Sequence, residues 1–163
     1  MPDQDHSKQK KLTPKEAKLK ASHFCAYQER SQQEVRDKLY EFGLYQSEVE
    51  EVLTELIVEG FINEERFAKA YIGGKFRMKK WGRVKILQSL KPHNISQYCI
   101  NKGLQEIDEE EYIDTLKEII SKKSVAIKAV NNYEHNHKLA RYAISRGFEP
   151  DLVWEILKSR EAN

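Results

Sequence analysis

The sequence predicts an all-α protein, an elongated tandem array of three three-helix repeats built as helix-turn-helix-like units. Apolar residues recur at spacings of three and four, so each helix would have one buried stripe and one charged face. The same apolar pattern returns at shifts of 51 and 104 residues, which indicates an internal repeat. No segment of useful length alternates with the period of a β-strand, so the prediction contains helices alone.

Three hydroxyl side chains mark the expected helix starts of the first repeat, residues 13–60. Thr13, Ser31 and Ser47 each precede a helical apolar pattern, and each is followed three residues later by a glutamate. In such a capping box the hydroxyl accepts a bond from the backbone of the glutamate, whose carboxylate bonds back to the cap. Residues 1–12 precede these signals and are expected to form a disordered basic N-terminal tail.

Two glycines mark the expected helix ends of the same repeat. Gly43 and Gly60 follow the apolar series of the second and third helices, at positions where a left-handed residue ends a helix. These two helices are therefore expected to end near Phe42 and Glu59.

The second repeat, residues 61–107, and the third, residues 108–163, keep this arrangement. Under the two shifts Gly43 corresponds to Asn94 and to Gly147. Asparagine is the non-glycine residue that best tolerates a left-handed backbone, so the same turn is expected there. A unit of about fifty residues has a marginal core by itself, so the repeats are expected to stack or share helices.

Positive charge is concentrated in the second repeat, although the whole chain has a formal net charge of only +2. The segment from Arg66 to Gln105 contains ten lysines or arginines and no acid, so it carries +10 while the rest of the chain carries −8. Six of the ten lie in KFRMKKWGRVKI, which runs from Lys75 to Ile86. This asymmetry favours an anionic partner, either DNA phosphates or an acidic protein surface.

Gly82 divides this basic stretch between two helices, because it corresponds to Ser31 and should start the second helix of its repeat. A glycine N-cap leaves backbone N–H groups open and the helix dipole adds positive charge, so Lys80, Gly82 and Arg83 are expected to form an anion site. Trp81 would pack beneath that site or stack on an exposed base. The alternative is an ordinary solvated basic face whose apolar residues serve the core. The candidate binding residues are Lys75, Arg77, Lys79, Lys80, Trp81, Gly82, Arg83 and Lys85.

Catalytic and metal-binding arrangements are poorly represented, so no enzyme activity, no metal and no cofactor is expected. His135 and His137 stand two residues apart, which on a helix points their imidazoles in different directions, and no third ligand is near. The acids between Glu106 and Asp114 are expected to start a long helix reaching towards Lys128, because acids complement the dipole there. A metal-dependent nuclease that uses these acids is the enzymatic alternative.

The cysteines and the distribution of apolar residues predict a cytoplasmic protein. Cys25 and Cys99 lack the C-x-x-C spacing and are expected to be buried, reduced thiols. No apolar run is long enough to span a bilayer, and the first residues lack the apolar core of a signal peptide. No membrane partner is therefore expected.

Specific motifs run through the three repeats. The first repeat contains R-S-x-x-E-V-x-x-x-L-x-x-x-G at residues 30–43, and G-F-I-N-E-E-R-F-A follows at residues 60–68. The second contains R-x-x-x-x-G-R-x-K-I-x-x-x-L at residues 77–90, and the third contains R-G-F at residues 146–148. From Ala17 to the C-terminus the chain thereby resembles the RecX family of recombination regulators.

This resemblance implies a non-catalytic protein that binds the RecA filament and represses the ATPase, strand-exchange and coprotease activities of RecA in recombination, DNA repair and the SOS response. A monomer that binds single- or double-stranded DNA weakly and without sequence preference is expected. The main alternative is a standalone, sequence-nonspecific DNA-binding protein with helix-turn-helix-like units. The family's basic contact surface is carried over onto the matching Arg77, Gly82, Arg83 and Lys85, with Lys75, Lys79 and Lys80 as local additions.

Overall fold

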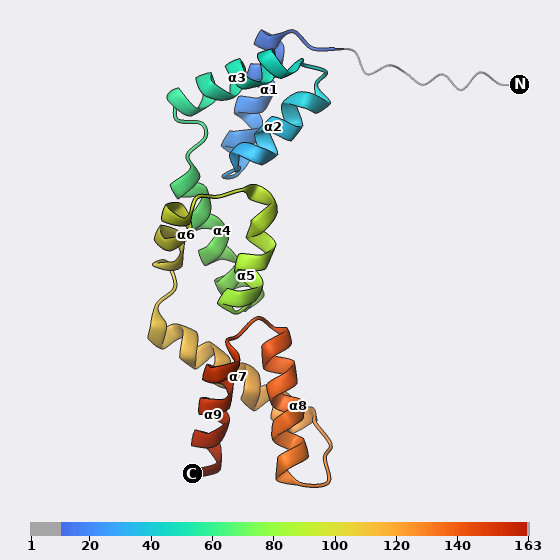
Figure 1. Cartoon of the computed structure of the whole chain (residues 1–163), viewed down its shortest axis with the longest axis vertical. Helices are drawn as coiled ribbons and strands as arrows, with labels where there is room; N and C mark the ends of the chain where they lie inside the picture. The colour runs from blue at the N-terminus through green and yellow to red at the C-terminus, as the bar shows by residue number, and fades with distance from the viewer. Residues whose placement is uncertain (1–10, 163) are drawn as a thin grey trace, which may run out of the picture. The chain divides into compact units, whose positions relative to one another are not determined.

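The computed structural model describes residues 11–162, and in that part of the chain every regular element is helical (Figure 1). The helices follow one another as three sets of three, α1–α3, α4–α6 and α7–α9, which we call the first, second and third domains. The all-α prediction is thus confirmed. The elements are α1 (Pro14–Tyr27), α2 (Gln32–Glu41), α3 (Gln46–Val58), α4 (Glu64–Lys79), α5 (Arg83–Leu90), the 3-10 helix η1 (Lys91–His93), α6 (Gln97–Leu104), α7 (Glu109–Ala126), α8 (Asn132–Ser145) and α9 (Pro150–Ala162).

The described residues fall into two compact units, and the division passes through the second domain. The first unit extends to Phe67 and also includes His93–Ile95. The second unit comprises Ala68–Pro92 and the chain from Ser96 onward. The first unit therefore contains the whole first domain, the start of α4 and the turn that follows η1.

Two of the three helix starts predicted for the first domain are confirmed. The Thr13 hydroxyl accepts a hydrogen bond from the Glu16 N–H at 3.2 Å, and the Ser31 hydroxyl accepts one from the Glu34 N–H at 3.1 Å. Each hydroxyl thus satisfies a backbone donor that has no partner within its own helix.

The helix start predicted at Ser47 is wrong, because α3 begins at Gln46. The Tyr45 N–H donates to the Glu48 carboxylate at 2.9 Å, which is the backward half of a capping box. This bond and the Lys11 ammonium, 2.9 Å from the carboxylate, hold the pKa of Glu48 below its usual value. The carboxylate of Glu48 therefore fixes a start two residues earlier than the serine would.

The predicted left-handed turns are confirmed at all four positions. Gly43, Gly60 and Gly147 have φ angles of +87°, +82° and +98°, and Asn94 has a φ of +53°. A fifth such residue, Lys80, follows α4 with a φ of +57° and was not predicted. A left-handed conformation costs an L-residue about 1 kcal/mol, so the surrounding structure must hold Lys80 there.

In the first unit, α1, α2 and α3 pack around one apolar core (Figure 1). The small residues Ala17 and Ala21 on α1 are fully buried, as are Val35 and Leu39 on α2, so the helices approach closely. The Leu12 N–H donates to the Phe42 carbonyl at 3.0 Å, which joins the chain before α1 to the turn after α2. Residues 1–10 of the predicted tail lie outside the described residues.

The turn after η1 contacts the N-terminus of α2 within the first unit. The Ser31 Oγ and the His93 Nδ1 are hydrogen-bonded at 2.8 Å, and the Glu34 carboxylate lies 3.2 Å from the same nitrogen. The Asn94 amide donates to the Gln33 side chain at 3.3 Å. A left-handed turn thus closes on the start of a helix from the preceding domain.

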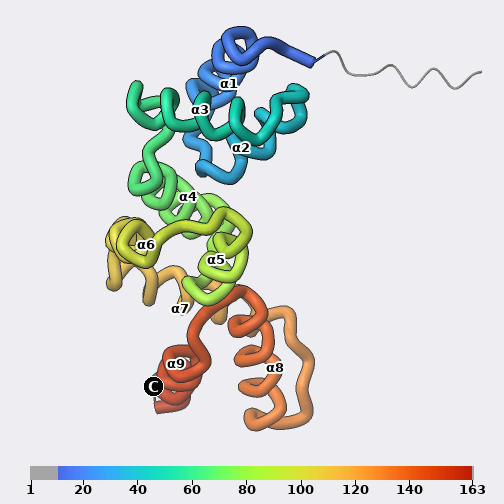
Figure 2. Tube along the Cα trace, turned by 45° about the horizontal axis from the view of Figure 1, so that its top comes forward, coloured from blue at the N-terminus to red at the C-terminus, as the bar shows by residue number. Residues whose placement is uncertain are grey.

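The second unit has its own aromatic core, centred on Tyr112 of α7. The Tyr112 ring lies 5.6 Å from the ring of Phe76 and 5.0 Å from that of Phe148, and all three side chains are buried. Helices α8 and α9 run antiparallel and side by side (Figure 2). The apolar positions predicted for the third repeat are confirmed as buried: Leu139, Phe148, Val153, Ile156 and Leu157.

Replacing Gly43 or Gly60 by alanine should lower the free energy of unfolding by about 1 kcal/mol, because both residues have a left-handed backbone. The loss should be larger for Gly43→Ala, since its Cβ would lie 3.1 Å from the Lys11 Cα, whereas nothing lies within 4 Å at Gly60. Chemical denaturation of the two variants measures the difference. Parental stability in Gly60→Ala would contradict a left-handed turn at that position.

Candidate binding surface at the α4–α5 junction

The predicted basic stretch forms the junction between α4 and α5. Helix α4 ends at Lys79, Lys80 turns the chain, Trp81 follows, and Gly82 is the N-cap of α5, as predicted. The eight candidate residues therefore share one junction, but they differ in what surrounds them. Some face solvent and others are covered by the third domain.

The open anion site expected at the start of α5 is wrong, because the third domain occupies its backbone donors. The Gly82 N–H donates to the Arg146 carbonyl at 2.8 Å, and the Val84 N–H donates to the Gly147 carbonyl at 2.9 Å. The Arg83 N–H donates to the Tyr112 hydroxyl at 3.0 Å. A helix N-terminus attracts anions only while such donors are free. Here they join α5 to the turn between α8 and α9 and to Tyr112 of α7.

Gly82 is required by the closeness of this contact. A Cβ on Gly82 would lie 2.2 Å from the Gly147 carbonyl carbon and 2.3 Å from the Phe148 nitrogen, distances that no side-chain movement relieves. Gly82 therefore serves close backbone packing between two domains of the second unit, in addition to starting α5.

Arg83 is also part of this contact and is only partly exposed. Its guanidinium lies 2.9 Å from the Glu109 carboxylate and 3.1 Å from that of Glu149, and it packs over the Tyr112 ring at 3.9 Å. Burial alone would lower the pKa of Arg83, but the hydrogen bonds to Glu109 and Tyr112 outweigh it and raise the pKa. Burial, with the hydrogen bond that Tyr112 donates to Glu149, raises the pKa of Tyr112. The positive charge of Arg83 is therefore neutralised within the protein.

Arg146 completes the contact and was not among the candidate residues. Its guanidinium donates to the Lys79 carbonyl at 2.7 Å, at the end of α4, while its own carbonyl accepts from Gly82. A cation near the last carbonyls of a helix is favourable. The sequence signal for Arg146 was the R-G-F motif, which marked a repeat ending but not its contact with α4.

The remaining basic residues face outward around Trp81. Arg77, Lys79 and Lys80 are exposed, and within residues 11–162 none of them lies within ion-pair distance of an acid. The same holds for Lys75 and Lys85 in that range, whose ammonium groups lie 5.2 Å and 4.5 Å from the centre of the Trp81 ring. These six residues, Lys75, Arg77, Lys79, Lys80, Trp81 and Lys85, are called the basic surface below.

The other sequence candidates have structural partners. His135 is hydrogen-bonded through Nε2 to the Ser124 hydroxyl at 2.9 Å, and the His137 ring lies 4.9 Å from that of Trp154. Asp108 caps α7 by accepting from the Glu111 N–H at 2.9 Å, which confirms the acids as a helix start. Across residues 11–162 no three or more His, Cys, Asp or Glu side chains are grouped to hold a metal.

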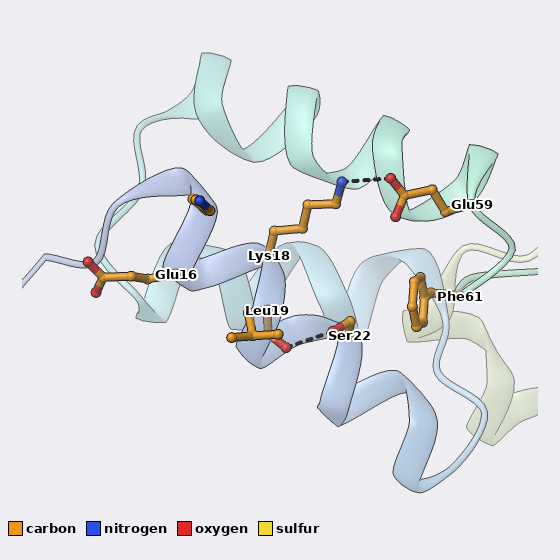
Figure 3. A pocket seen from close by; sticks show the side chains of 7 residues that line it. Glu16, Lys18, Leu19, Ser22, Glu59 and Phe61 are labelled. Atoms are coloured by element: carbon orange, nitrogen blue, oxygen red, sulfur yellow. Dashed lines mark hydrogen bonds and ion pairs between the residues drawn. The ribbon is translucent and has the colours of Figure 1, made fainter.

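A pocket of about 510 Å³ lies in the first unit, between α1 and the end of α3 (Figure 3). The Lys18 ammonium donates to the Glu59 carboxylate at 2.7 Å, and this bond, with one to Glu55, raises the pKa of Lys18. The Ser22 hydroxyl donates to the Leu19 carbonyl. Lys18, Glu59 and Ser22 thus already have partners within the protein. The pocket is lined by Lys15, Glu16, Lys18, Leu19, Ser22, Glu59 and Phe61.

Cys25 and Cys99 are both buried and have free thiols, as predicted. Burial raises the pKa of the Cys25 thiol, which keeps it protonated and unreactive. None of the described helices combines the length and apolar character needed to cross a membrane.

Tandem three-helix domains with an outward basic surface define a helical-repeat protein with a candidate binding surface. The chain matches three family models, described as the first, second and third three-helix domains of RecX, at residues 17–56, 63–104 and 109–157. Together these matches cover most of the chain. The chain belongs to the RecX family.

Relatives named Regulatory protein RecX match along most of this chain. The one from Clostridium acetobutylicum is 30% identical over 146 residues, which cover 87% of this chain and 67% of that protein. The one from Clostridium tetani is 33% identical over 134 residues, covering 80% of this chain and 58% of that protein. The one from Bacillus cytotoxicus is 26% identical over 137 residues, covering 84% and 51%. The chain therefore spans between about half and two thirds of their length.

A solved structure has the same fold. RecX from Lactobacillus salivarius superposes with a TM-score of 0.80 at 18% identity, covering 92% of this chain and 97% of that chain. At this identity the similarity concerns the arrangement of helices.

Gly82→Ala should lower the free energy of unfolding of the second unit by about 2 kcal/mol, because its methyl group overlaps the Gly147 backbone. Gly74→Ala is the matched control: Gly74 lies within α4 with nothing within 4 Å of a Cβ, and alanine is the better helix former. The control should gain about 0.5–1 kcal/mol. Equal melting temperatures for the two variants would argue against the close backbone contact.

The Arg83–Glu109 pair should make stability depend on acid pH. Hydrogen bonding to Arg83 lowers the pKa of Glu109 from 4.5. The pair therefore stabilises the fold above pH 4.5 and loses its effect as pH falls through the lower folded-state value. Glu109→Gln should reduce the melting temperature near neutral pH and reduce it less at about pH 3, because the pair weakens as the carboxylate takes up a proton. A difference of the same size at both values would exclude this ionisation as the cause.

Proposed function

We propose that this chain binds the RecA nucleoprotein filament and modulates, mainly by inhibition, RecA ATPase, strand exchange and coprotease activity in recombination and DNA repair. Support comes from its membership of the RecX family and from the basic surface, whose cations form no ion pair within the described residues. Cations held on the surface without a counter-charge attract an anionic partner. The chain would act as a stoichiometric, non-enzymatic binder.

The basic surface supplies the contact in this proposal, and the interdomain contact beneath it holds the surface in shape. Arg77, Lys79 and Lys80 offer charge to solvent, whereas Arg83 is neutralised by Glu109 and Glu149. We therefore remove Gly82 and Arg83 from the candidate contacts and assign them to the contact between α5 and the third domain. The repeat boundaries 13–60, 61–107 and 108–163 and a monomeric, cytoplasmic protein remain parts of the proposal.

Filament modulation follows if the chain prefers one state of the filament over another. A ligand shifts an equilibrium only by its differential affinity for the two states. A surface that contacts RecA and DNA phosphates at the same time would bind the filament more strongly than it binds free RecA or bare DNA. Binding of that kind can hinder subunit addition or stabilise a less active filament at protein levels too low to coat the DNA.

The deciding experiment titrates this chain into RecA hydrolysing ATP on single-stranded DNA, beside its binding to bare DNA at two salt concentrations. Inhibition at substoichiometric amounts, with weak and salt-sensitive binding to bare DNA, is the expected result. Hydrolysis lost only at coating concentrations would replace the proposal by its alternative. That alternative, a standalone nonspecific DNA-binding protein, is favoured by the same cluster of unpaired cations.

Reversing two charges of the basic surface, Arg77→Glu with Lys79→Glu, should weaken inhibition of RecA by about tenfold or more, because both side chains are exposed and carry no ion pair with described residues. The melting temperature should stay near that of the parent protein. Lys117→Glu with Lys158→Glu makes the same charge change on the third domain and is the matched control. Equal inhibition by both folded double variants would place the contact elsewhere.

A further inference from the structure

Two lysines from different helices converge on the ring of Trp81. Lys75 belongs to α4 and Lys85 to α5, and their ammonium groups lie 5.2 Å and 4.5 Å from the centre of the indole ring. Lys75 lies equally close, at 5.2 Å, to the ring of Tyr71, whose hydroxyl donates to Ser89 at 2.8 Å. Aromatic and cationic groups therefore alternate across the junction.

The junction fixes Trp81 where these cations meet. The Lys80 N–H donates to the Phe76 carbonyl at 3.0 Å, its left-handed backbone turns the chain, and Gly82 is held against Gly147 on the other side. Trp81 is thus attached between two constrained residues and is only partly buried. An indole at this place is held by the backbone, and the core of the second unit does not enclose it.

We propose that Trp81, Lys75 and Lys85 form a binding site for single-stranded nucleic acid, in which an unpaired base stacks on the indole and the two ammonium groups bind adjoining phosphates. Both cations lie within about 5 Å of the same ring centre, so they are no more than about 10 Å apart. That separation suits neighbouring phosphates of one strand. This inference rests on the proposed function, and it identifies the part of the basic surface that contacts DNA.

The relative strengths of cation–ring and base–ring contacts favour replacement of a lysine by a base on the Trp81 ring. A cation over an exposed aromatic ring contributes about 0.5–1 kcal/mol. A base stacked on an aromatic side chain contributes about 1–3 kcal/mol, and the displaced ammonium gains a phosphate partner. In the free protein the lysines cover the indole, and in the complex the base replaces them.

Single-stranded nucleic acid fits this site better than the two other anionic partners. An acidic protein surface would pair with the lysines but offers no flat ring to stack on the indole. Bases in a duplex are already stacked on one another, so a duplex presents phosphates but no free base face. Only an unpaired strand satisfies both the ring and the cations.

Tryptophan fluorescence tests the site directly, because the chain contains only two tryptophans. In the full-length Trp154→Phe variant, Trp81 is the remaining tryptophan, and a thymine oligonucleotide should quench its emission by about half or more. A duplex of equal length should quench it little. No quenching at oligonucleotide concentrations that saturate binding in an independent anisotropy measurement would overturn the inference.

Affinity measurements separate stacking from charge. Trp81→Leu should weaken binding to the single strand by about tenfold and leave duplex binding nearly unchanged, and Trp81→Phe should restore most of the loss. Lys75→Gln with Lys85→Gln should reduce the salt slope of single-strand binding by about 1.4. Equal losses for single strand and duplex in the folded Trp81→Leu variant would refute stacking.

The same variants distinguish failure of this site from failure of the proposed function. If Trp81→Leu loses inhibition of RecA but binds bare single strands normally, the ring contacts protein, so this inference fails and the proposed function stands. If a single strand quenches Trp81 while the parent chain leaves RecA hydrolysis unchanged at all but coating concentrations, the DNA site stands and filament modulation fails.

Discussion

The structure depends on the left-handed turn after the second helix of each domain, because every such turn receives the N-terminus of an earlier helix. At the turn around Gly43, the Phe42 carbonyl accepts a hydrogen bond from the N–H of Leu12, which lies just before α1. The turn at Asn94 binds Gln33, at the start of α2. The turn at Gly147 accepts backbone bonds from the start of α5. A reversed backbone exposes carbonyls that a straight helix would bond internally, so the turn can both end a helix and bind another.

In both units a left-handed turn packs against the start of an earlier helix, but the groups that make the contact differ. In the first unit the helix start carries Ser31, whose hydroxyl is shared between its own helix and His93. In the second unit Gly82 has no side chain, and the backbones come so close that a Cβ would overlap Gly147. A serine permits a polar, side-chain-mediated contact, whereas a glycine permits direct backbone contact. The repeats therefore keep their apolar frame while their contacts differ.

Charge in the basic stretch is divided between structure and surface. Arg83 forms ion pairs with Glu109 and Glu149. Arg146, from the third domain, donates to the last carbonyl of α4, and both contacts hold the second unit together. Partners that neutralise a cation remove it from competition for a ligand, so the number of positive charges in the sequence overstates what the surface offers. The cations around Trp81 keep their charge because the aromatic ring attracts them without neutralising them.

The sequence by itself determined the helices, most of their caps, the buried stripes and the four left-handed turns, because these depend on residues within about four positions of one another. It misplaced the start of α3, where Glu48 and Ser47 compete as capping residues, and it missed the left-handed Lys80. It located the basic junction between α4 and α5, but it did not show that the backbone N–H groups at the start of α5 already have hydrogen-bond partners. Only the tertiary structure decided that the α5 N–H groups are occupied and Arg83 neutralised, since Tyr112 and Glu109 lie 29 and 26 residues away in the chain. Hydrogen bonds over that distance follow from how domains pack, which no local pattern specifies.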